Sequence, residues 1–203
     1  MELDHLVVAG ETLEDAVRFS EGAVGLPLVA GGEHVHFGTH NRVLGLEGRE
    51  YFEAISVNPE AGVLGRPRWF GLDHFSGPAR LITWVCRVES LERALEIWPE
   101  AGEVVALSRG ELRWRMAVPE GGRLSYGGVM PLLIEWDGDV HPCDGLGSCG
   151  LGIGRLTLAH PDAGRAGELL ERLGLKDNRI EVSEGDAPAI GAALSGPSGH
   201  KRL

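Results

Sequence analysis

Residues 3–10 are almost entirely apolar, and a segment with helical spacing follows them directly. In that segment Leu13, Ala16 and Val17 recur every three or four positions, and Thr12 stands where a helix cap is expected. Strand-like runs then follow at residues 26–33, 41–46 and 50–57. The pattern therefore predicts the element order βαβββ for the first part of the chain.

The same order of elements returns further along the chain. Leu91 lies 78 positions after Leu13, and Gly110 lies 78 positions after Gly32. The second set consists of a strand, a helix and three more strands at residues 81–88, 90–96, 103–111, 111–118 and 129–136. Because a repeat at a fixed offset indicates repeated structural units, we predict two βαβββ modules that superpose.

A third, partial copy follows, with a strand at 154–160, a helix at 163–173 and strand-like runs at 179–185 and 189–194. The fold class predicted is α+β, with paired βαβββ modules and a partial third βαββ module at the C-terminus. We expect the modules to occupy residues 1–61, 80–142 and 154–203, separated by a connector at 62–79 and a glycine-rich linker at 143–153. Residues 199–203 are predicted to be a tail.

Composition narrows the classes of partner. The chain has 203 residues, of which 43% are hydrophobic, so it can bury a substantial core. The net charge of -11, without a cluster of lysines and arginines, argues against nucleic acid and against an anionic membrane surface as partners. No run approaches the ~18 apolar residues of a membrane span, and no basic leader precedes residue 3, so a cytoplasmic location is expected.

Two ionisable residues stand on predicted apolar strand faces. Side chains alternate along a strand, so His5 shares a face with Leu3 and Val7, and Glu53 shares one with Ile55. A charge on such a face is costly unless it is paired, bound to a metal or neutralised by a shifted pKa. We therefore treat both residues as candidates for a functional site.

The sequence resembles the glyoxalase-like domain of the vicinal oxygen chelate superfamily, which also contains bleomycin-resistance proteins and dioxygenases. The resemblance rests on residues 3–8, on the turn at 31–34 with 38–41 after it, and on 51–53, and it extends from residue 3 to about residue 200. It implies that the paired modules form a cupped mixed sheet. It also implies a small-molecule substrate as partner. The partial third module could be either a cap or an element that forms a homodimer.

In metal-dependent members of that superfamily, the ligands come from the first and last strands of each module. The corresponding places here are His5, Glu53, Thr83 and Glu135, of which the threonine is a poor ligand. The remaining three residues would hold Zn, Ni, Mn or Fe, with open positions for water or substrate. The alternative is that His5 is a hydrogen-bonded strand histidine and that both glutamates pair with arginines.

The segment 34–41 and the connector supply candidate substrate contacts. His34 and His36 share a strand face, so one of them could be a fourth metal ligand, while His34 and Asn41 could instead bind a substrate carbonyl or carboxylate. A structural turn is the third interpretation of this segment. Trp69 lies in an aromatic and basic stretch that reads either as a lid over an anionic or aromatic substrate or as a linker packed on the rim.

The leading functional hypothesis is a metal-dependent enzyme of the lyase or isomerase type that acts on a small oxygenated molecule. The metal would chelate neighbouring substrate oxygens, and Glu53 or Glu135 would shuttle a proton. An extradiol dioxygenase is an alternative that would favour two histidines and one carboxylate. A metal-free protein that sequesters a small ligand, of the bleomycin-resistance type, and a structural pseudo-enzyme are the others.

Overall fold

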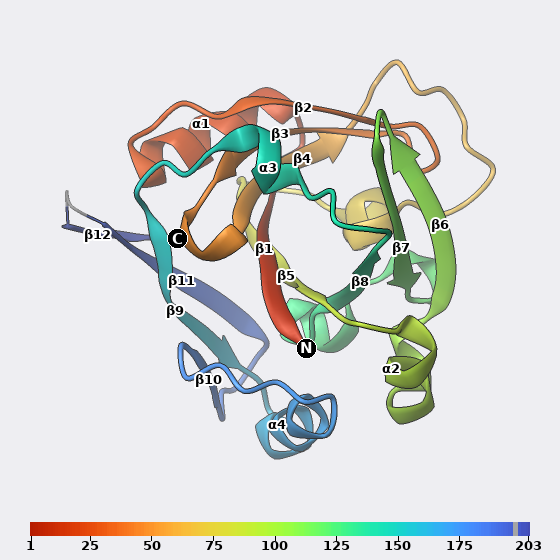
Figure 1. The fold of residues 1–203 in the computed structure, drawn as a ribbon, viewed down its shortest axis with the longest axis vertical. Helices are drawn as coiled ribbons and strands as arrows, with labels where there is room; N and C mark the ends of the chain where they lie inside the picture. Colours follow the sequence, from red (N-terminus) through yellow and green to blue (C-terminus); the bar gives the residue numbers. More distant parts are fainter. Residues whose placement is uncertain (197–198) are drawn as a thin grey trace.

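Eight strands form one curled sheet, in which two βαβββ units lie side by side in the computed structural model (Figure 1). The structure describes residues 1–196 and 199–203. The first unit contains β1 (Glu2–Ala9), α1 (Leu13–Val24), β2 (Val29–His34), β3 (Thr39–Gly45) and β4 (Tyr51–Val57). The second contains β5 (Arg80–Arg87), α2 (Leu91–Ile97), β6 (Glu103–Arg109), β7 (Leu112–Val118) and β8 (Leu132–Trp136). The strand order β2-β3-β4-β1-β5-β8-β7-β6 confirms the predicted paired modules and the cupped mixed sheet.

The two units meet at the centre of the sheet, where β1 and β5 pair antiparallel. Each of these strands is interrupted at the same place: the register shifts at Asp4 in β1 and at Ile82 in β5, which are again 78 positions apart. Beside this pair, β4 runs parallel to β1 and β8 runs parallel to β5. The pairings thus relate the two modules by an approximate twofold axis.

The 78-residue offset ends after the helices. It holds for the helix starts, where Thr12 and Ser90 each accept a hydrogen bond from the backbone three residues on and so cap α1 and α2. The first helix has 12 residues and the second has 7. Gly32 consequently lies inside β2, whereas Gly110 lies in the turn after β6, so the predicted equivalence of these glycines was wrong.

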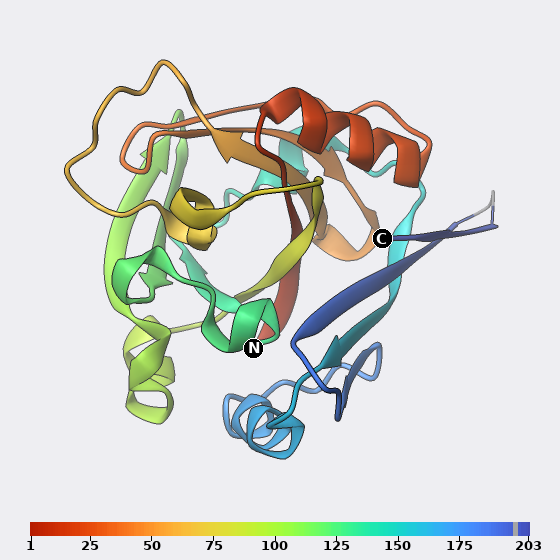
Figure 2. The ribbon, with the colours of Figure 1, turned by 180° about the vertical axis from the view of Figure 1, so that it is seen from behind.

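The third module forms a separate four-stranded sheet in the order β10-β9-β11-β12, beside α1 and β5 (Figure 2). Its elements are β9 (Gly152–Ala159), α4 (Ala163–Arg172), β10 (Ile180–Ser183), β11 (Ala189–Gly196) and β12 (Gly199–Arg202). The segment predicted as a linker begins within a short helix, α3 (Pro142–Leu146), which lies against β3 of the first module. The first four elements of the third module follow the predicted βαββ order, and β12 adds a fifth element that was not predicted. The predicted tail was wrong, because β12 pairs with β11 and both backbone groups of Leu203 bond to Ala192.

The third sheet is not a copy of the other two modules in its pairing. Here β9 runs parallel to β10, the strand that follows its helix, whereas β1 pairs with the last strand of its own module. One ion pair ties this sheet to the first module, since Arg179 bonds to both carboxylate oxygens of the buried Glu50. None of the helices in the described residues has the length and apolar character that a membrane span needs.

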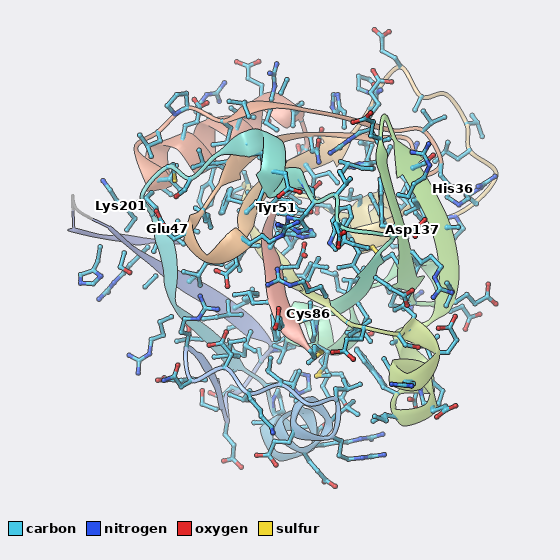
Figure 3. All side chains as sticks on the ribbon, viewed as in Figure 1. His36, Glu47, Tyr51, Cys86, Asp137 and Lys201 are labelled. Carbon is cyan, nitrogen blue, oxygen red and sulfur yellow. The ribbon has the colours of Figure 1, made fainter. Side chains whose placement is uncertain are left out.

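Apolar side chains pack on both faces of the curled sheet. The convex face is covered by the helices and the third module, and its largest fully buried side chains include Trp84 and Phe52. The concave face is aromatic, with Trp69, Phe70 and Trp114 buried there. Among the residues labelled in Figure 3, Tyr51 lies inside the cup and His36 at its outer edge. Because the concave face is largely apolar, a polar side chain that points into the cup is a candidate for a functional role.

Candidate functional site

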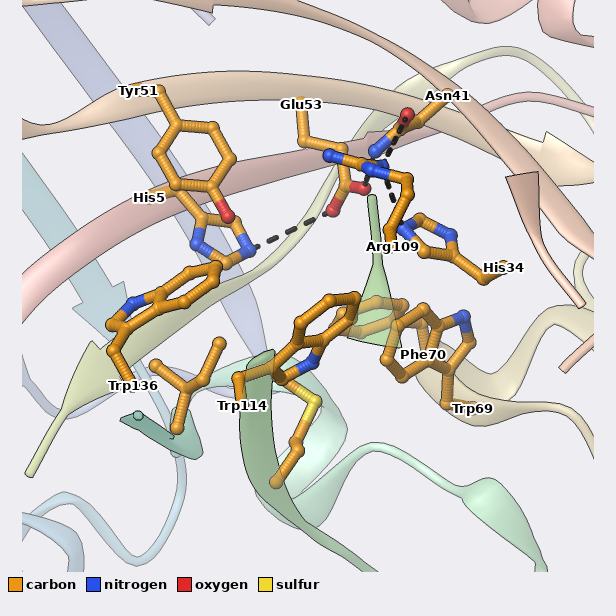
Figure 4. Close-up of a pocket in the computed structure, with 12 residues that line it drawn as sticks. His5, His34, Asn41, Tyr51, Glu53, Trp69, Phe70, Arg109, Trp114 and Trp136 are labelled. Atoms are coloured by element: carbon orange, nitrogen blue, oxygen red, sulfur yellow. Dashed lines mark hydrogen bonds and ion pairs between the residues drawn. The ribbon is translucent and has the colours of Figure 1, made fainter. Parts of the chain in front are cut away.

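A small pocket occupies the concave face of the curled sheet and receives side chains from both modules (Figure 4). The central cavity measures about 30 Å³, which is room for only one or two waters. Its walls are mostly aromatic and its polar groups are few. The lining residues are His5, His34, Asn41, Tyr51, Glu53, Trp69, Phe70, Arg109, Trp114, Met116, Ile134 and Trp136.

A buried carboxylate next to the pocket fixes the orientation of His5. At the bulge in β1, Asp4 Oδ1 lies 2.6 Å from His5 Nδ1, and both residues are buried. The other oxygen, Oδ2, accepts hydrogen bonds from Trp136 Nε1 and His141 Nε2, each at 3.0 Å. Burial alone would raise the pKa of Asp4, but the hydrogen bonds from His141 and His5 outweigh it and leave the pKa below its usual value. An ionised Asp4 requires His5 to carry a proton on Nδ1, so Nε2 faces the pocket.

Glu53 faces His5 across the pocket. The distance from His5 Nε2 to Glu53 Oε2 is 3.6 Å, and the two side chains are 3% and 5% exposed. The His5 ring also stacks on Tyr51, with 4.2 Å between ring centroids, and Asn41 Nδ2 donates a hydrogen bond to Glu53 Oε1. An imidazole and a carboxylate are thus held facing each other by neighbours that occupy their remaining polar atoms.

Arg109 brings a positive charge from the second module to the first. It ends β6 and lies against β2, where a Cβ on Gly32 would stand 2.7 Å from its Cδ. Its Nη1 donates to His34 Nε2 at 3.2 Å and to Asn41 Oδ1 at 3.4 Å. Burial and the charge of Arg109 lower the pKa of His34 to about 3, so this histidine is neutral, with Nδ1 bonded to Thr39 Oγ1 at 3.1 Å.

Five of the residues predicted from the sequence meet in this pocket, namely His5, Glu53, His34, Asn41 and Trp69. The indole of Trp69 is buried, stacks on Phe37 and donates its N–H to Thr39. The connector therefore contributes a wall of the pocket. His36 was placed wrongly, because the chain turns after His34 and leaves His36 at the exposed hairpin tip beside Arg66.

Glu135 lies outside the pocket, on the other face of the sheet. Glu53 pairs with Val7 and Leu132 pairs with Val85, so Leu132 is the counterpart of Glu53 in the second module. Glu135 comes three positions later, an odd number, and therefore points to the opposite face. There it bonds to the backbone N–H of Leu91 and to Arg115. The prediction that it shares a cavity with His5 and Glu53 was wrong, and for this residue the predicted alternative of pairing with an arginine is confirmed.

The donor set does not fit a divalent metal site of the predicted kind. Only His5 and Glu53 remain of the four expected positions, because Thr83 donates to the carbonyl of Gly128 and Leu132 is apolar. His34 cannot complete the set in this arrangement, since its Nε2 accepts from Arg109. Within residues 1–196 and 199–203, no group of three or more His, Cys, Asp or Glu side chains is placed to hold an ion.

Sequence reasoning missed several residues of the site. Asp4 adjoins His5 in sequence, and simple alternation assigned it to the opposite face; only the bulge lets both side chains meet. His141 follows the last predicted strand of the second module without any local signal, yet it is buried against Asp4 and caps α3. Arg109 belongs to an exposed hairpin in the sequence pattern, and no local signal shows that β6 curls round to β2.

Comparison with known proteins gives a family match. The model of the glyoxalase-like domain family matches residues 3–174. A hypothetical protein from Staphylococcus aureus has a similar structure at 13% identity, covering 92% of this chain and 87% of that one, with a TM-score of 0.64. Methylmalonyl-CoA epimerase from Mycobacterium tuberculosis is 20% identical, covering 68% of this chain and 89% of that one, with a TM-score of 0.43. No curated protein matches the sequence. At these identities the structural likeness concerns the fold alone.

Proposed function

The chain belongs to the glyoxalase-like domain family, and from that premise we propose that it binds a small oxygenated metabolite and moves a proton on it with His5 and Glu53. The observation that carries the proposal is the Asp4–His5 hydrogen bond of 2.6 Å, which directs His5 Nε2 toward Glu53 and the cavity. Such a pairing of carboxylate and imidazole sets the tautomer of a general base. The reaction class is an isomerase or lyase type of proton transfer.

The residues divide this task between them. Asp4 holds the Nδ1 proton of His5, so Nε2 is the atom that exchanges a proton with the ligand. Glu53 Oε2 lies 3.6 Å from it, close enough for the two groups to serve successively as base and acid on one ligand carbon. His5 Nε2 takes the proton next to the carbonyl and leaves an enolate, the proton passes across the 3.6 Å to Glu53 Oε2, and Glu53 returns it to the ligand, so the pair ends in its starting state.

The arrangement favours this reaction over the metal-dependent forms of it. A metal-dependent lyase or an extradiol dioxygenase needs a third protein ligand, and the second module offers Thr83 and Leu132 where ligands are expected. The aromatic walls favour a second candidate function, in which the pocket sequesters a small ligand without changing it. The homodimer and the cytoplasmic location remain predictions.

Hydrogen–deuterium exchange separates the two candidates. We would incubate the protein in D₂O with pyruvate, hydroxyacetone or acetoacetate and follow loss of the C–H signal next to the carbonyl by proton NMR. The expected result is exchange that His5→Asn and Glu53→Gln each slow by at least about 100-fold, as removal of a general base typically does. Glu135→Gln is the matched control, because that residue is a carboxylate outside the pocket.

The same experiment has two outcomes against proton transfer. Exchange that is abolished by EDTA and restored by Zn²⁺ or Mn²⁺ would show that the reaction depends on a metal. Saturable binding of one of these compounds, with no exchange above the rate of buffer and no effect of His5→Asn, would identify a sequestering protein.

A further inference from the structure

The guanidinium of Arg109 has hydrogen-bond donors that no described residue accepts from. Its Nη1 is the only nitrogen of the guanidinium with hydrogen bonds to the described residues, and both acceptors, on His34 and Asn41, are neutral. No carboxylate of the described residues lies within the 4.0 Å that defines an ion pair with Arg109. The Nε and Nη2 donors are therefore free at the mouth of the pocket, where the side chain is half-buried.

The nearest acid of the pocket is held apart from Arg109. Asn41 stands between them, with its Oδ1 accepting from Gly32 N–H and from Arg109 and its Nδ2 donating to Glu53. Glu53 instead turns its second oxygen toward His5, as Figure 4 shows. A positive and a negative charge thus share one pocket without neutralising each other. Each is free to meet a different part of a ligand.

From this geometry we propose that the ligand carries a carboxylate, which Arg109 binds, and that its next carbon faces His5 and Glu53. The inference rests on the proposed function and names the substrate class of that site. A guanidinium presents its donors as a planar fork that matches both oxygens of a carboxylate. The central cavity of about 30 Å³ admits only a small group, so the ligand must be a short chain or one flat ring that lies mostly in the mouth of the pocket beside Trp114 and Trp136.

The test compares carboxylates with their neutral amides. The probes are pyruvate with pyruvamide and benzoate with benzamide, titrated against tryptophan fluorescence, since three indoles line the pocket. We expect at least one carboxylate to bind at least tenfold more tightly than its amide. Arg109→Gln should abolish that difference, and Arg109→Lys, which keeps the charge without the fork, should retain part of it.

Matched variants keep the test decisive. Arg113 is an exposed arginine of the same hairpin, and among the described residues its guanidinium bonds only to the backbone carbonyls of Gly110 and Leu112. Arg113→Gln should therefore leave the preference for carboxylates intact. The comparison is read from binding alone and needs no proton transfer, so a failed proton-transfer proposal does not affect this result. Equal binding of acids and amides, absence of binding by all four probes, or a preference that survives in a folded Arg109→Gln protein would each overturn the proposal.

Discussion

The two central strands β1 and β5 present equivalent positions to one cup, but their side chains differ in kind. His5 corresponds to Thr83, and the bulge that holds Asp4 in β1 holds Ile82 in β5. Beside them, Glu53 of β4 corresponds to Leu132 of β8. The first module therefore supplies an imidazole and a carboxylate, while the second has a bonded hydroxyl and an apolar side chain at the same places.

This difference shows that a duplicated scaffold does not require a duplicated site. The Thr83 hydroxyl donates a hydrogen bond to the carbonyl of Gly128, and Leu132 packs among apolar side chains. Neither side chain therefore needs a bound metal or small molecule as a partner. The second module instead acts across the cup, because Arg109 reaches the first module at His34 and Asn41.

The largest effect is expected at the bulge of the first module. Asp4→Ala would leave three donors without their acceptor, on the buried His5 and His141 and on the half-buried Trp136. The free energy of unfolding should fall by about 3–5 kcal/mol, as when one partner of a buried charged pair is removed. Urea denaturation measures this. Ile82→Val at the equivalent bulge should cost only about 0.5–1.5 kcal/mol, and equal costs at the two bulges would contradict the contrast.

Restoring ligands to the second module should create the metal site that it lacks. The double variant Thr83→His with Leu132→Glu adds an imidazole and a carboxylate opposite His5 and Glu53. Its Zn²⁺ affinity, measured by calorimetry, should exceed that of the wild type by at least about 100-fold, since even residues that only support ligands are worth 10- to 100-fold. A wild-type protein that binds Zn²⁺ as tightly as the double variant would show that the first module suffices.

Stability should depend on pH through His34, whereas strands β5 to β8 contain no histidine. The pKa of His34 is lowered to about 3 in the folded protein from the ordinary 6.5, so only the unfolded chain binds a proton between these values. The contribution of His34 to the free energy of unfolding is therefore fully present above pH 6.5 and is lost as the pH falls toward 3. Lowering the pH from 7 to 5 should cost about 2 kcal/mol from this residue. His34→Gln should remove that part of the pH dependence in denaturant titrations; an unchanged pH profile would refute it.

The smallest effect is expected for the carboxylate on the outer face of the second module. Glu135→Gln weakens a partly exposed pair with Arg115 and a contact with the N–H of Leu91, so the cost should be about 1 kcal/mol or less. Thermal melting measures the change, and binding of the carboxylate probes should stay within twofold of wild type. Loss of probe binding in this variant would mean that Glu135 serves the pocket after all.

The paired modules, the Thr12 helix cap and the site residues His5 and Glu53 could be predicted from the sequence. Apolar periodicity is local, so it places β1, α1, β5 and α2 without any knowledge of the fold, and the 78-residue repeat pairs them. His5 and Glu53 could be found for the same reason, because an ionisable group on an apolar strand face is visible in the sequence. His34, Asn41 and Trp69 were candidates with alternatives left open, and their meeting with His5 and Glu53 in one pocket is seen only in the structure.

The other residues of the site depend on how the strands pair and how the sheet curls. A shift of strand register by an odd number of residues moves every side chain to the other face of the sheet. The register in which β8 pairs with β5 cannot be deduced from the sequence, and Glu135 was assigned to the wrong face for this reason. The bulge at Asp4 depends equally on strand pairing. Arg109 enters the site because the sheet curls until β6 meets β2, and curvature is a property of the whole sheet that no local pattern in the chain encodes.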